Sequence, residues 1–91
     1  MQQEKIIALP IDGELDLHTF SPKELSPLVT DYLMECRKRG ILTVRVIHGK
    51  GAGVVKRSLH AILKRLDMVE SFSLAPPHMG GFGATLVRLR P

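Results

Sequence analysis

The 91-residue chain has a single cysteine, no tryptophan, three phenylalanines and one tyrosine. The lone cysteine, Cys36, excludes a disulfide framework, and the four scattered histidines beside it give no zinc-finger spacing. The chain also lacks any apolar run of the roughly 18 residues that a transmembrane helix requires. Met1–Asp16 carries one positive side chain, Lys5, and no long apolar stretch, so no secretory signal is expected. These absences predict a reduced, cytoplasmic protein of one domain, with no membrane partner and a monomeric state by default.

Positive charge is in modest surplus, with 13 lysines and arginines against 9 aspartates and glutamates and a net charge of +4. This surplus favours an anionic partner such as nucleic acid, but it carries no information about the fold. The scarcity of aromatic residues argues against base stacking as the main grip on a nucleic acid. Recognition of a phosphate backbone or of a duplex shape is therefore favoured over reading of single-stranded bases.

The N-terminal region contains a short apolar stretch, Ile6–Leu9, which stops at Pro10. This pattern predicts an arm or a short edge strand over residues 1–10, with the folded domain over 11–91. Leu15–His18 then alternates apolar and polar residues, which is the period of a strand with one buried face.

A first helix is predicted from its start signals and its apolar stripe. Ser21 can cap the helix, Pro22 suits the first helical position and Glu24 completes a capping box. Because a proline inside a helix removes a backbone hydrogen bond, Pro27 requires either a separate first turn or a helix that starts close to it. Apolar residues then recur at three- and four-residue steps, and basic residues and a glycine end the helix: Leu25, Leu28, Val29, Tyr32, Leu33, Cys36, Arg37, Lys38, Arg39 and Gly40.

The remainder of the chain alternates further strand and helix patterns. β-branched residues predict a central strand, an amphipathic pattern predicts a second helix, and two further strands flank a glycine-rich loop. In order these are the strand 41–47, the helix 54–66, the strand 69–74, the loop 76–83 and the strand 84–90. The predicted order is strand, helix, strand, helix, strand, strand, which indicates an α/β fold.

Polar residues follow the first two predicted strands at the points where these strands end. A strand–helix–strand unit of this length joins parallel strands, so both strands end at one edge of the sheet, where α/β proteins bind ligands. We therefore expect Asp16, His18 and His48 to line one cleft. A single histidine at a strand end is more often structural than catalytic, and it is this predicted convergence that favours a functional interpretation. Imidazole titrates near neutral pH, so His18 and His48 are candidate general acid and base.

The glycine-rich turn His48–Gly53 joins a strand to the start of a helix. Backbone N–H groups and the helix dipole favour an anion at such a junction, and glycines let the backbone approach it closely. Gly49, Gly51, Gly53 and the cation Lys50 therefore predict a phosphate site, although the Walker pattern is absent.

Two other histidines have different expectations. His60 lies in the middle of the second predicted helix, near Lys56 and Lys64, and is expected on its solvated face. His78 lies in the glycine-rich loop, and both a surface position and a place in the cleft remain open for it.

Three segments of the chain resemble the signature segments of the Smr (small MutS-related) domain family. They are LDLH at 15–18, HGKGAG at 48–53 and GGFGATLVRL at 80–89, and they occur in the family's order and spacing. Thr19 stands where many members have glycine after LDLH, which is similar to a short bacterial stand-alone subgroup with LDLHTF.

The resemblance implies a two-layer α/β sandwich with a mixed four-stranded sheet and two helices, similar to the C-terminal domain of translation initiation factor three. It also implies nucleic-acid binding with nicking or endonuclease activity, on DNA in some members and on RNA in others, and a link to ribosome rescue in some relatives. The residues tied to activity by the family's motifs are Asp16, His18, His48, Gly49, Lys50 and Gly51.

The resulting hypothesis is a small nuclease with a nucleic acid, or a ribosome, as its partner. Its phosphate-binding residues would include the 49–53 turn, Gly81 and Gly83 of the glycine-rich loop, and Arg88 and Arg90 as the extension of a basic track. Asp16 would orient one of the histidines or bind a divalent ion, although no set of metal ligands is assigned. A divalent cation is a candidate cofactor above all for DNA cleavage, which needs an activated water. The alternatives left open are a nucleic-acid-binding module without catalysis and a binder of small phosphate compounds.

Overall fold

The computed structural model describes residues 9–51 and 53–91, so most of the predicted arm or edge strand at Ile6–Leu9 lies outside the described residues. The main elements are β1 (Glu14–Asp16), α1 (Leu25–Lys38), β2 (Thr43–Ile47), α2 (Val54–Arg65), β3 (Val69–Leu74) and β4 (Ala84–Leu89). Three short 3-10 helices accompany them: η2 (Pro22–Glu24), η3 (Pro77–Met79) and η4 (Gly81–Gly83). This order of strands and helices confirms the predicted one.

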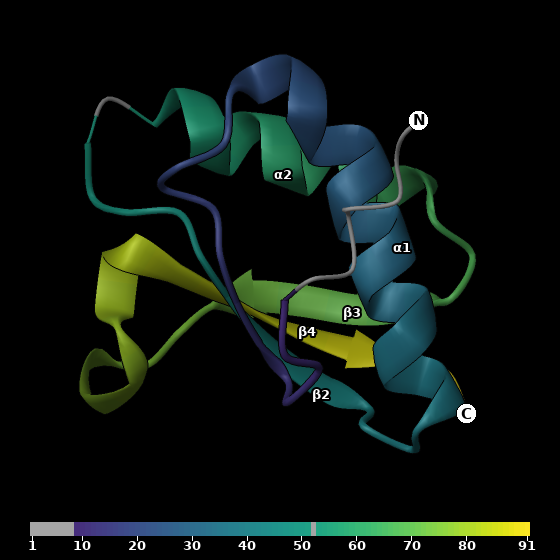
Figure 1. Cartoon of the computed structure of the whole chain (residues 1–91). Helices are drawn as coiled ribbons and strands as arrows, with labels where there is room; N and C mark the ends of the chain where they lie inside the picture. The colour runs from purple at the N-terminus through teal and green to yellow at the C-terminus, as the bar shows by residue number, and fades with distance from the viewer. Residues whose placement is uncertain (1–8, 52) are drawn as a thin grey trace.

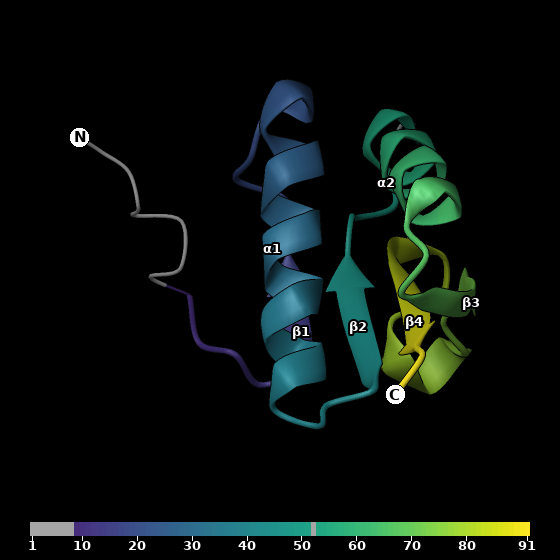
Figure 2. The same cartoon turned by 90° about the vertical axis from the view of Figure 1, so that its right-hand side faces the viewer.

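The four strands form one mixed sheet in the order β1-β2-β4-β3. β1 and β2 are parallel, whereas β4 pairs antiparallel with both β2 and β3. The two helices form the second layer of the sandwich (Figures 1 and 2). The two-layer α/β architecture is therefore confirmed. Among the described residues, no helix has both the length and the apolar character needed to span a bilayer.

The start of α1 shows how the two prolines are accommodated. Pro22 opens the 3-10 turn η2, and the backbone N–H of Ser21 donates to Glu24 Oε1 at 2.8 Å. Pro27 is the third residue of α1, where a backbone N–H would have no partner within the helix. Both arrangements considered for Pro27 thus occur together, because a separate turn precedes a helix that starts beside it.

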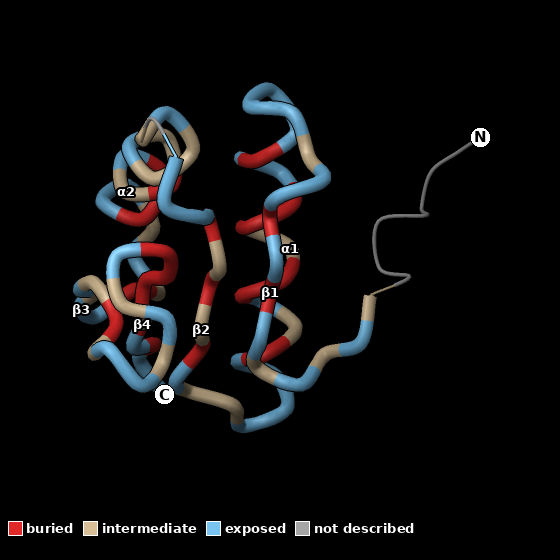
Figure 3. Tube along the Cα trace, turned by 90° about the vertical axis from the view of Figure 1, so that its left-hand side faces the viewer, coloured by how far each residue is buried: buried red, intermediate tan, exposed pale blue. Residues whose placement is uncertain are grey.

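The core lies between the helices and one face of the sheet. Buried positions alternate with exposed ones along β1 and mainly with half-buried ones along β2 (Figure 3), so that Leu15, Val44 and Val46 face the helices. The predicted apolar stripe of α1 is buried in full: Leu25, Leu28, Val29, Tyr32, Leu33 and Cys36. Each large side chain removed from water in this way contributes about 1.5–3 kcal/mol to folding.

The carboxyl ends of three strands meet at one edge of the sheet. β1 and β2 are parallel neighbours, and β3 runs in the same direction because β4 is antiparallel to both β2 and β3. The loop between Leu74 and Ala84 therefore begins and ends at the same edge as the turn after β2. The topology in this way positions all three signature segments together.

Candidate functional site

Backbone hydrogen bonds join the three signature segments at the carboxyl edge. The N–H of Leu17 donates to the carbonyl oxygen of Ile47 at 2.8 Å, which continues the β1–β2 pairing. The N–H groups of His48 and Gly49 both donate to the carbonyl oxygen of Gly83 at 2.9 Å. The predicted convergence of these segments at one edge is thus observed.

Asp16 and His18 form an exposed pair at this edge. Asp16 Oδ1 lies 2.8 Å from His18 Nδ1 and also accepts the backbone N–H of His18 at 3.0 Å. The pKa of the Asp16 carboxyl is lowered, first by the backbone hydrogen bond from His18 and then by the side-chain one. Because the ionised carboxylate can only accept, Nδ1 of His18 carries the proton and Nε2 is left to exchange one. The His18 side chain is 69% exposed, so Nε2 is accessible to a ligand.

His48 lies in a different environment, buried at 7% exposure. Its Nδ1 is 3.0 Å from the carbonyl oxygen of Gly49, and its Nε2 is 2.9 Å from Thr85 Oγ1. Thr85 Oγ1 also lies 2.8 Å from Nε2 of His60, and the two imidazole rings meet edge to face with centroids 6.2 Å apart. A hydrogen-bonded chain therefore runs from His60 on α2 through Thr85 on β4 to His48.

The hydrogen-bonding groups of this chain fix the proton positions in its neutral form. A carbonyl oxygen can only accept, so Nδ1 of His48 donates to Gly49 and Nε2 of His48 accepts the Thr85 hydroxyl proton. The Thr85 oxygen is then an acceptor for the Nε2–H of His60. Both ring nitrogens of His48 are engaged, and the residue holds its own turn against the sheet.

His60 was predicted to be a solvated surface residue, and this prediction is wrong. The residue is half-buried, bonded to Thr85 and packed against Phe72 with ring centroids 4.8 Å apart. Burial lowers the pKa of His60, and the nearby His48, Lys56 and Lys64 lower it further. The apolar pattern of the helix could not predict the burial of His60, because its partner Thr85 is distant in sequence.

The two strand-end histidines thus share an edge but occupy its opposite faces. His48 continues the buried face of Val44 and Val46 and points toward the helix layer, where its ring meets His60. Asp16 belongs to the alternate, exposed positions of β1, away from buried Leu15. The structure brings Asp16 and His18 together and sets His48 on the other face, so the three residues do not line one cleft as expected.

The glycine-rich turn forms a small hollow at the start of α2. The hollow has a volume of about 120 Å³, and it is lined by His48, Gly49, Gly51, Gly53, Val54, Val55 and Lys56. Gly53 precedes the helix with φ +87°, a left-handed conformation that favours glycine. The first N–H groups of a helix have no intrahelical acceptor, so the hollow is suited to an anion.

Lys50 and the glycine-rich loop lie against one another. A side chain at Gly83 would meet Lys50 Cγ at 3.3 Å and the Gly49 backbone at 3.6 Å, so glycine is needed for this approach. Gly81 lines a larger cavity beside Lys50, and Gly83 supplies the carbonyl that anchors the turn. Both loop glycines, which were predicted to bind phosphate, therefore lie at the carboxyl edge beside Lys50.

The two C-terminal arginines lie at the other end of the sheet. Arg88 pairs with Thr43 at the beginning of β2, and Arg90 Nε donates to the carbonyl oxygen of Asp67 at 2.8 Å. Neither is brought to the glycine turn, because β4 runs away from that edge after Ala84. His78 is exposed in η3, on the loop that borders the edge.

Within residues 9–51 and 53–91, no three histidine, cysteine, aspartate or glutamate side chains gather closely enough to hold a metal ion. The acidic side chain of Glu14 is instead paired with Arg45, whose other terminal nitrogen donates to the Met79 carbonyl oxygen at 3.1 Å. Arg45 thus ties the glycine-rich loop to β1.

Sequence reasoning missed Thr85, Arg45 and Phe82. Thr85 follows GGFGA directly and is fully buried at 0% exposure, and a hydroxyl in such a place needs a hydrogen-bond partner. Phe82, at 74% exposure, gives no sequence signal, because only the structure separates an exposed aromatic from a core one.

Comparison with known proteins identifies the relatives of the chain. The family model for the Smr domain matches residues 15–90. The chain is 42% identical over 78 residues to Endonuclease MutS2 of Thermus thermophilus, a match that covers 86% of this chain and 10% of that protein. Endonuclease MutS2 of Carboxydothermus hydrogenoformans is 40% identical over 77 residues, covering 85% and 10%. The chain therefore spans about a tenth of the length of these curated relatives.

Two solved structures have the same fold. The crystal structure of the Smr domain of Thermus thermophilus MutS2 matches with a TM-score of 0.83 at 41% identity, covering 88% of this chain and 100% of that one. The crystal structure of YdaL, a stand-alone small MutS-related protein from Escherichia coli, matches with a TM-score of 0.82 at 30% identity, covering 90% and 67%.

Proposed function

The chain belongs to the Smr domain family, and on this premise we propose that it is a nuclease that nicks or cleaves nucleic acid. The proposal is carried by the exposed Asp16–His18 pair, which lies at the same sheet edge as the glycine-rich turn. The MutS2 relatives are named endonucleases, and this name supports the proposal. The support is partial, because the chain matches only about a tenth of their length.

The pair is suited to proton transfer during phosphodiester cleavage. Asp16 orients the imidazole by accepting its Nδ1–H, so His18 Nε2 is the nitrogen that accepts the proton of the attacking oxygen. That oxygen forms a bond to phosphorus, the bond to the leaving oxygen breaks, and the leaving oxygen takes a proton from solvent. On RNA the attacking group can be the neighbouring 2′-hydroxyl, whereas on DNA it must be water.

The substrate phosphate is proposed to bind at the turn 49–53. The hollow there is lined by three glycines and the first residues of α2, and the same turn carries Lys50, whose side chain lies against Gly83. Backbone N–H groups and a lysine bind any phosphodiester, so this site holds the strand without reading its sequence.

His48 is assigned a positioning role in this proposal, in place of general acid or base. It lines the hollow, but its ring nitrogens are occupied by the Gly49 carbonyl and the Thr85 hydroxyl, so neither is free to exchange a proton with a bound strand. It supports the phosphate site by fixing the backbone from which Gly49 and Lys50 project.

The test is a cleavage panel on end-labelled single- and double-stranded DNA and RNA, each with EDTA, Mg²⁺ or Mn²⁺. We expect wild-type protein to cut at least one substrate, and the panel reports the metal requirement directly. His18→Ala should lower the rate by about 100-fold, the lower range of general acid–base effects. The panel also includes Lys50→Ala, which removes the charge of the glycine-rich turn. Its matched control is Lys38→Ala, which removes the same charge at the C-terminal end of α1.

Equal rates for wild type and His18→Ala would show that the catalytic assignment is wrong. Salt-sensitive binding with uncut substrates after long incubation would instead support the alternative of a binding module without catalysis. Weaker binding by Lys50→Ala than by Lys38→Ala is expected under both interpretations and tests the phosphate site alone.

A further inference from the structure

One aromatic side chain differs from the others of the chain in its exposure. Tyr32 is buried at 1% exposure, and Phe20 and Phe72 pack partly buried against the core. Phe82, in η4, is 74% exposed. Exposure alone means little, since Met34 and Val54 are also exposed apolar residues. Phe82 stands out because of what lies beside it.

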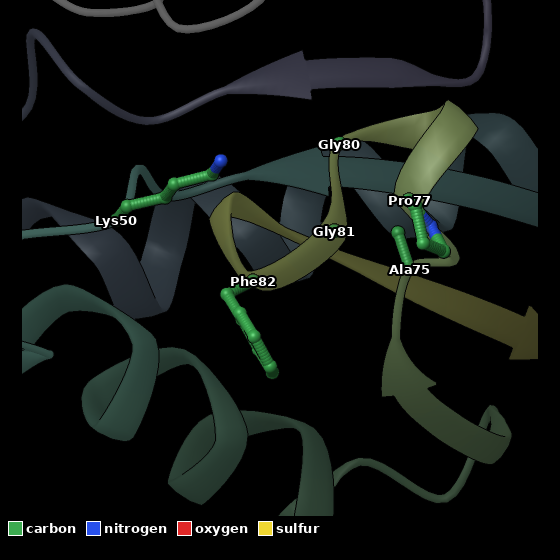
Figure 4. Close-up of a pocket in the computed structure, with 6 residues that line it drawn as sticks. All are labelled: Lys50, Ala75, Pro77, Gly80, Gly81 and Phe82. Atoms are coloured by element: carbon green, nitrogen blue, oxygen red, sulfur yellow. The ribbon is translucent and has the colours of Figure 1, made fainter.

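A cavity of about 500 Å³ adjoins Phe82 and is lined by Lys50, Ala75, Pro77, Gly80, Gly81 and Phe82. Figure 4 shows Lys50 and Phe82 at one end of this set, Ala75 and Pro77 at the other, and the two glycines between them. The lining side chains are apolar apart from that of Lys50, and the volume lies in the range of small-molecule sites.

Lys50, the charged residue that lines this cavity, also belongs to the proposed phosphate site. The Lys50 stem lies against Gly83, next to Phe82 in sequence, since an added Cβ at Gly83 would be 3.3 Å from Lys50 Cγ. One cavity is therefore lined by a residue with a flat apolar ring and by a residue with a positive charge, whose side chains point in different directions in Figure 4. These are the two features that bind the base and the phosphate of one nucleotide.

The loop that presents Phe82 is held in place by hydrogen bonds. Within the loop, the N–H of Gly81 donates to the carbonyl oxygen of Pro76 at 3.0 Å, and the N–H of Gly83 donates to that of Gly80 at 2.9 Å. The Arg45 side chain donates to the carbonyl oxygen of Met79 at 3.1 Å. The carbonyl oxygen of Gly83 in turn accepts hydrogen bonds from the N–H groups of His48 and Gly49 at 2.9 Å. The ring therefore projects from an ordered segment, and little conformational freedom is lost when a ligand stacks on it.

We propose that this cavity is a nucleobase subsite, in which an unpaired base stacks on Phe82 while its phosphate is held by Lys50. The inference rests on the proposed nuclease function and specifies its substrate class: a single strand, or a nucleotide turned out of a duplex. A base paired inside a helix has no free face to offer the ring.

The subsite tolerates any base. Lys50 has the only charged or hydrogen-bonding side chain of the lining, so no side chain is available to read a Watson–Crick edge. The scarcity of aromatics in the chain argues against an extended stacking surface, and a single exposed ring is sufficient for one base.

The absence of tryptophan from the sequence provides a direct test. The Phe82→Trp variant has one indole, whose fluorescence reports a base stacked on it. Titration with short single-stranded oligonucleotides should quench this fluorescence, and an abasic strand of the same length should bind without quenching. Met34→Trp, which places the only indole on an exposed position of α1, should show no quenching with either strand.

A second measurement uses the protein without an indole. Phe82→Ala should weaken binding of single-stranded oligonucleotides about tenfold, leave binding of the abasic strand unchanged and leave the thermal midpoint unchanged. If Phe82→Ala binds both strands like wild type and Phe82→Trp is not quenched, the subsite is refuted while the nuclease proposal stands. If wild-type protein binds no oligonucleotide at all, the proposed function itself is overturned, and this inference with it.

Discussion

Two histidine arrangements at one sheet edge differ in almost every property that decides a chemical role. His18 is 69% exposed in its side chain, and its Nδ1 is hydrogen-bonded to Asp16 Oδ1, which leaves Nε2 accessible among the described residues. His48 is 7% exposed and uses both ring nitrogens, one for Gly49 and one for Thr85. Histidines of two signature segments can therefore lie at one edge of the sheet and still have different roles. We assign proton transfer to the exposed histidine and support of the turn to the buried one.

The largest expected effect separates these duties through stability. His48→Ala removes a buried ring together with its two hydrogen bonds, so it should lower the free energy of unfolding by about 3 kcal/mol. His18→Ala removes an exposed ring and should stay within about 0.5 kcal/mol of wild type. Urea denaturation of the two variants measures the difference. Equal losses of stability in both would contradict the contrast between the two sites.

A second test isolates the hydroxyl that joins the buried pair. Thr85→Val keeps the side-chain shape but removes the partner of Nε2 in both His48 and His60, so a loss of about 1–3 kcal/mol is expected. Thr85→Ser is the matched control, because it retains the hydroxyl and loses only a methyl group. Thermal and urea unfolding of the pair provide the measurement. If Thr85→Val were as stable as Thr85→Ser, the hydrogen-bonded chain through Thr85 would not contribute to stability.

The smallest expected effect is the pH dependence of stability that comes from His60. Its pKa in the folded protein lies below the ordinary value of 6.5, mainly because of burial and then because of His48, Lys56 and Lys64. The unfolded chain therefore binds a proton first as the pH falls, and the stability present above pH 6.5 decreases on further acidification. Denaturation at a series of pH values between about 7 and 5 should show this decline.

His60→Gln is the control for this decline, since glutamine can still bond to Thr85 but does not titrate. Its stability should fall less steeply over the same interval. A slope as steep as that of wild type would assign the titration to another residue.

Local patterns were sufficient for the elements and for most of the core. The three- and four-residue spacing of α1 predicted its buried face in full, and the capping pattern at Ser21 marks the 3-10 turn η2 that precedes α1. These signals lie within one turn of chain, where propensity and periodicity act. The strand order β1-β2-β4-β3 had no comparable signal, because it depends on pairings between segments far apart in sequence.

The candidate site was predictable in its location but not in its orientation. The parallel crossover rule placed Asp16, His18 and His48 at one edge, and the structure has them there. Strand alternation through Val44 and Val46 could also have placed His48 on the buried face. Its partners Thr85 and His60 lie on other elements, so the sequence alone could not show that its nitrogens are occupied.

The position of β4 has a consequence for a chain that is still being made. β4 follows the other described strands in sequence, yet it lies between β2 and β3 and is the only strand with which β3 pairs. The Gly83 carbonyl and the Thr85 hydroxyl, which fix the His48 turn, also come at the start of this strand. A partly synthesised chain therefore holds the complete HGKGAG segment without the contacts that shape it. Under the proposed function, the phosphate site at this turn is therefore assembled only after β4 has been made.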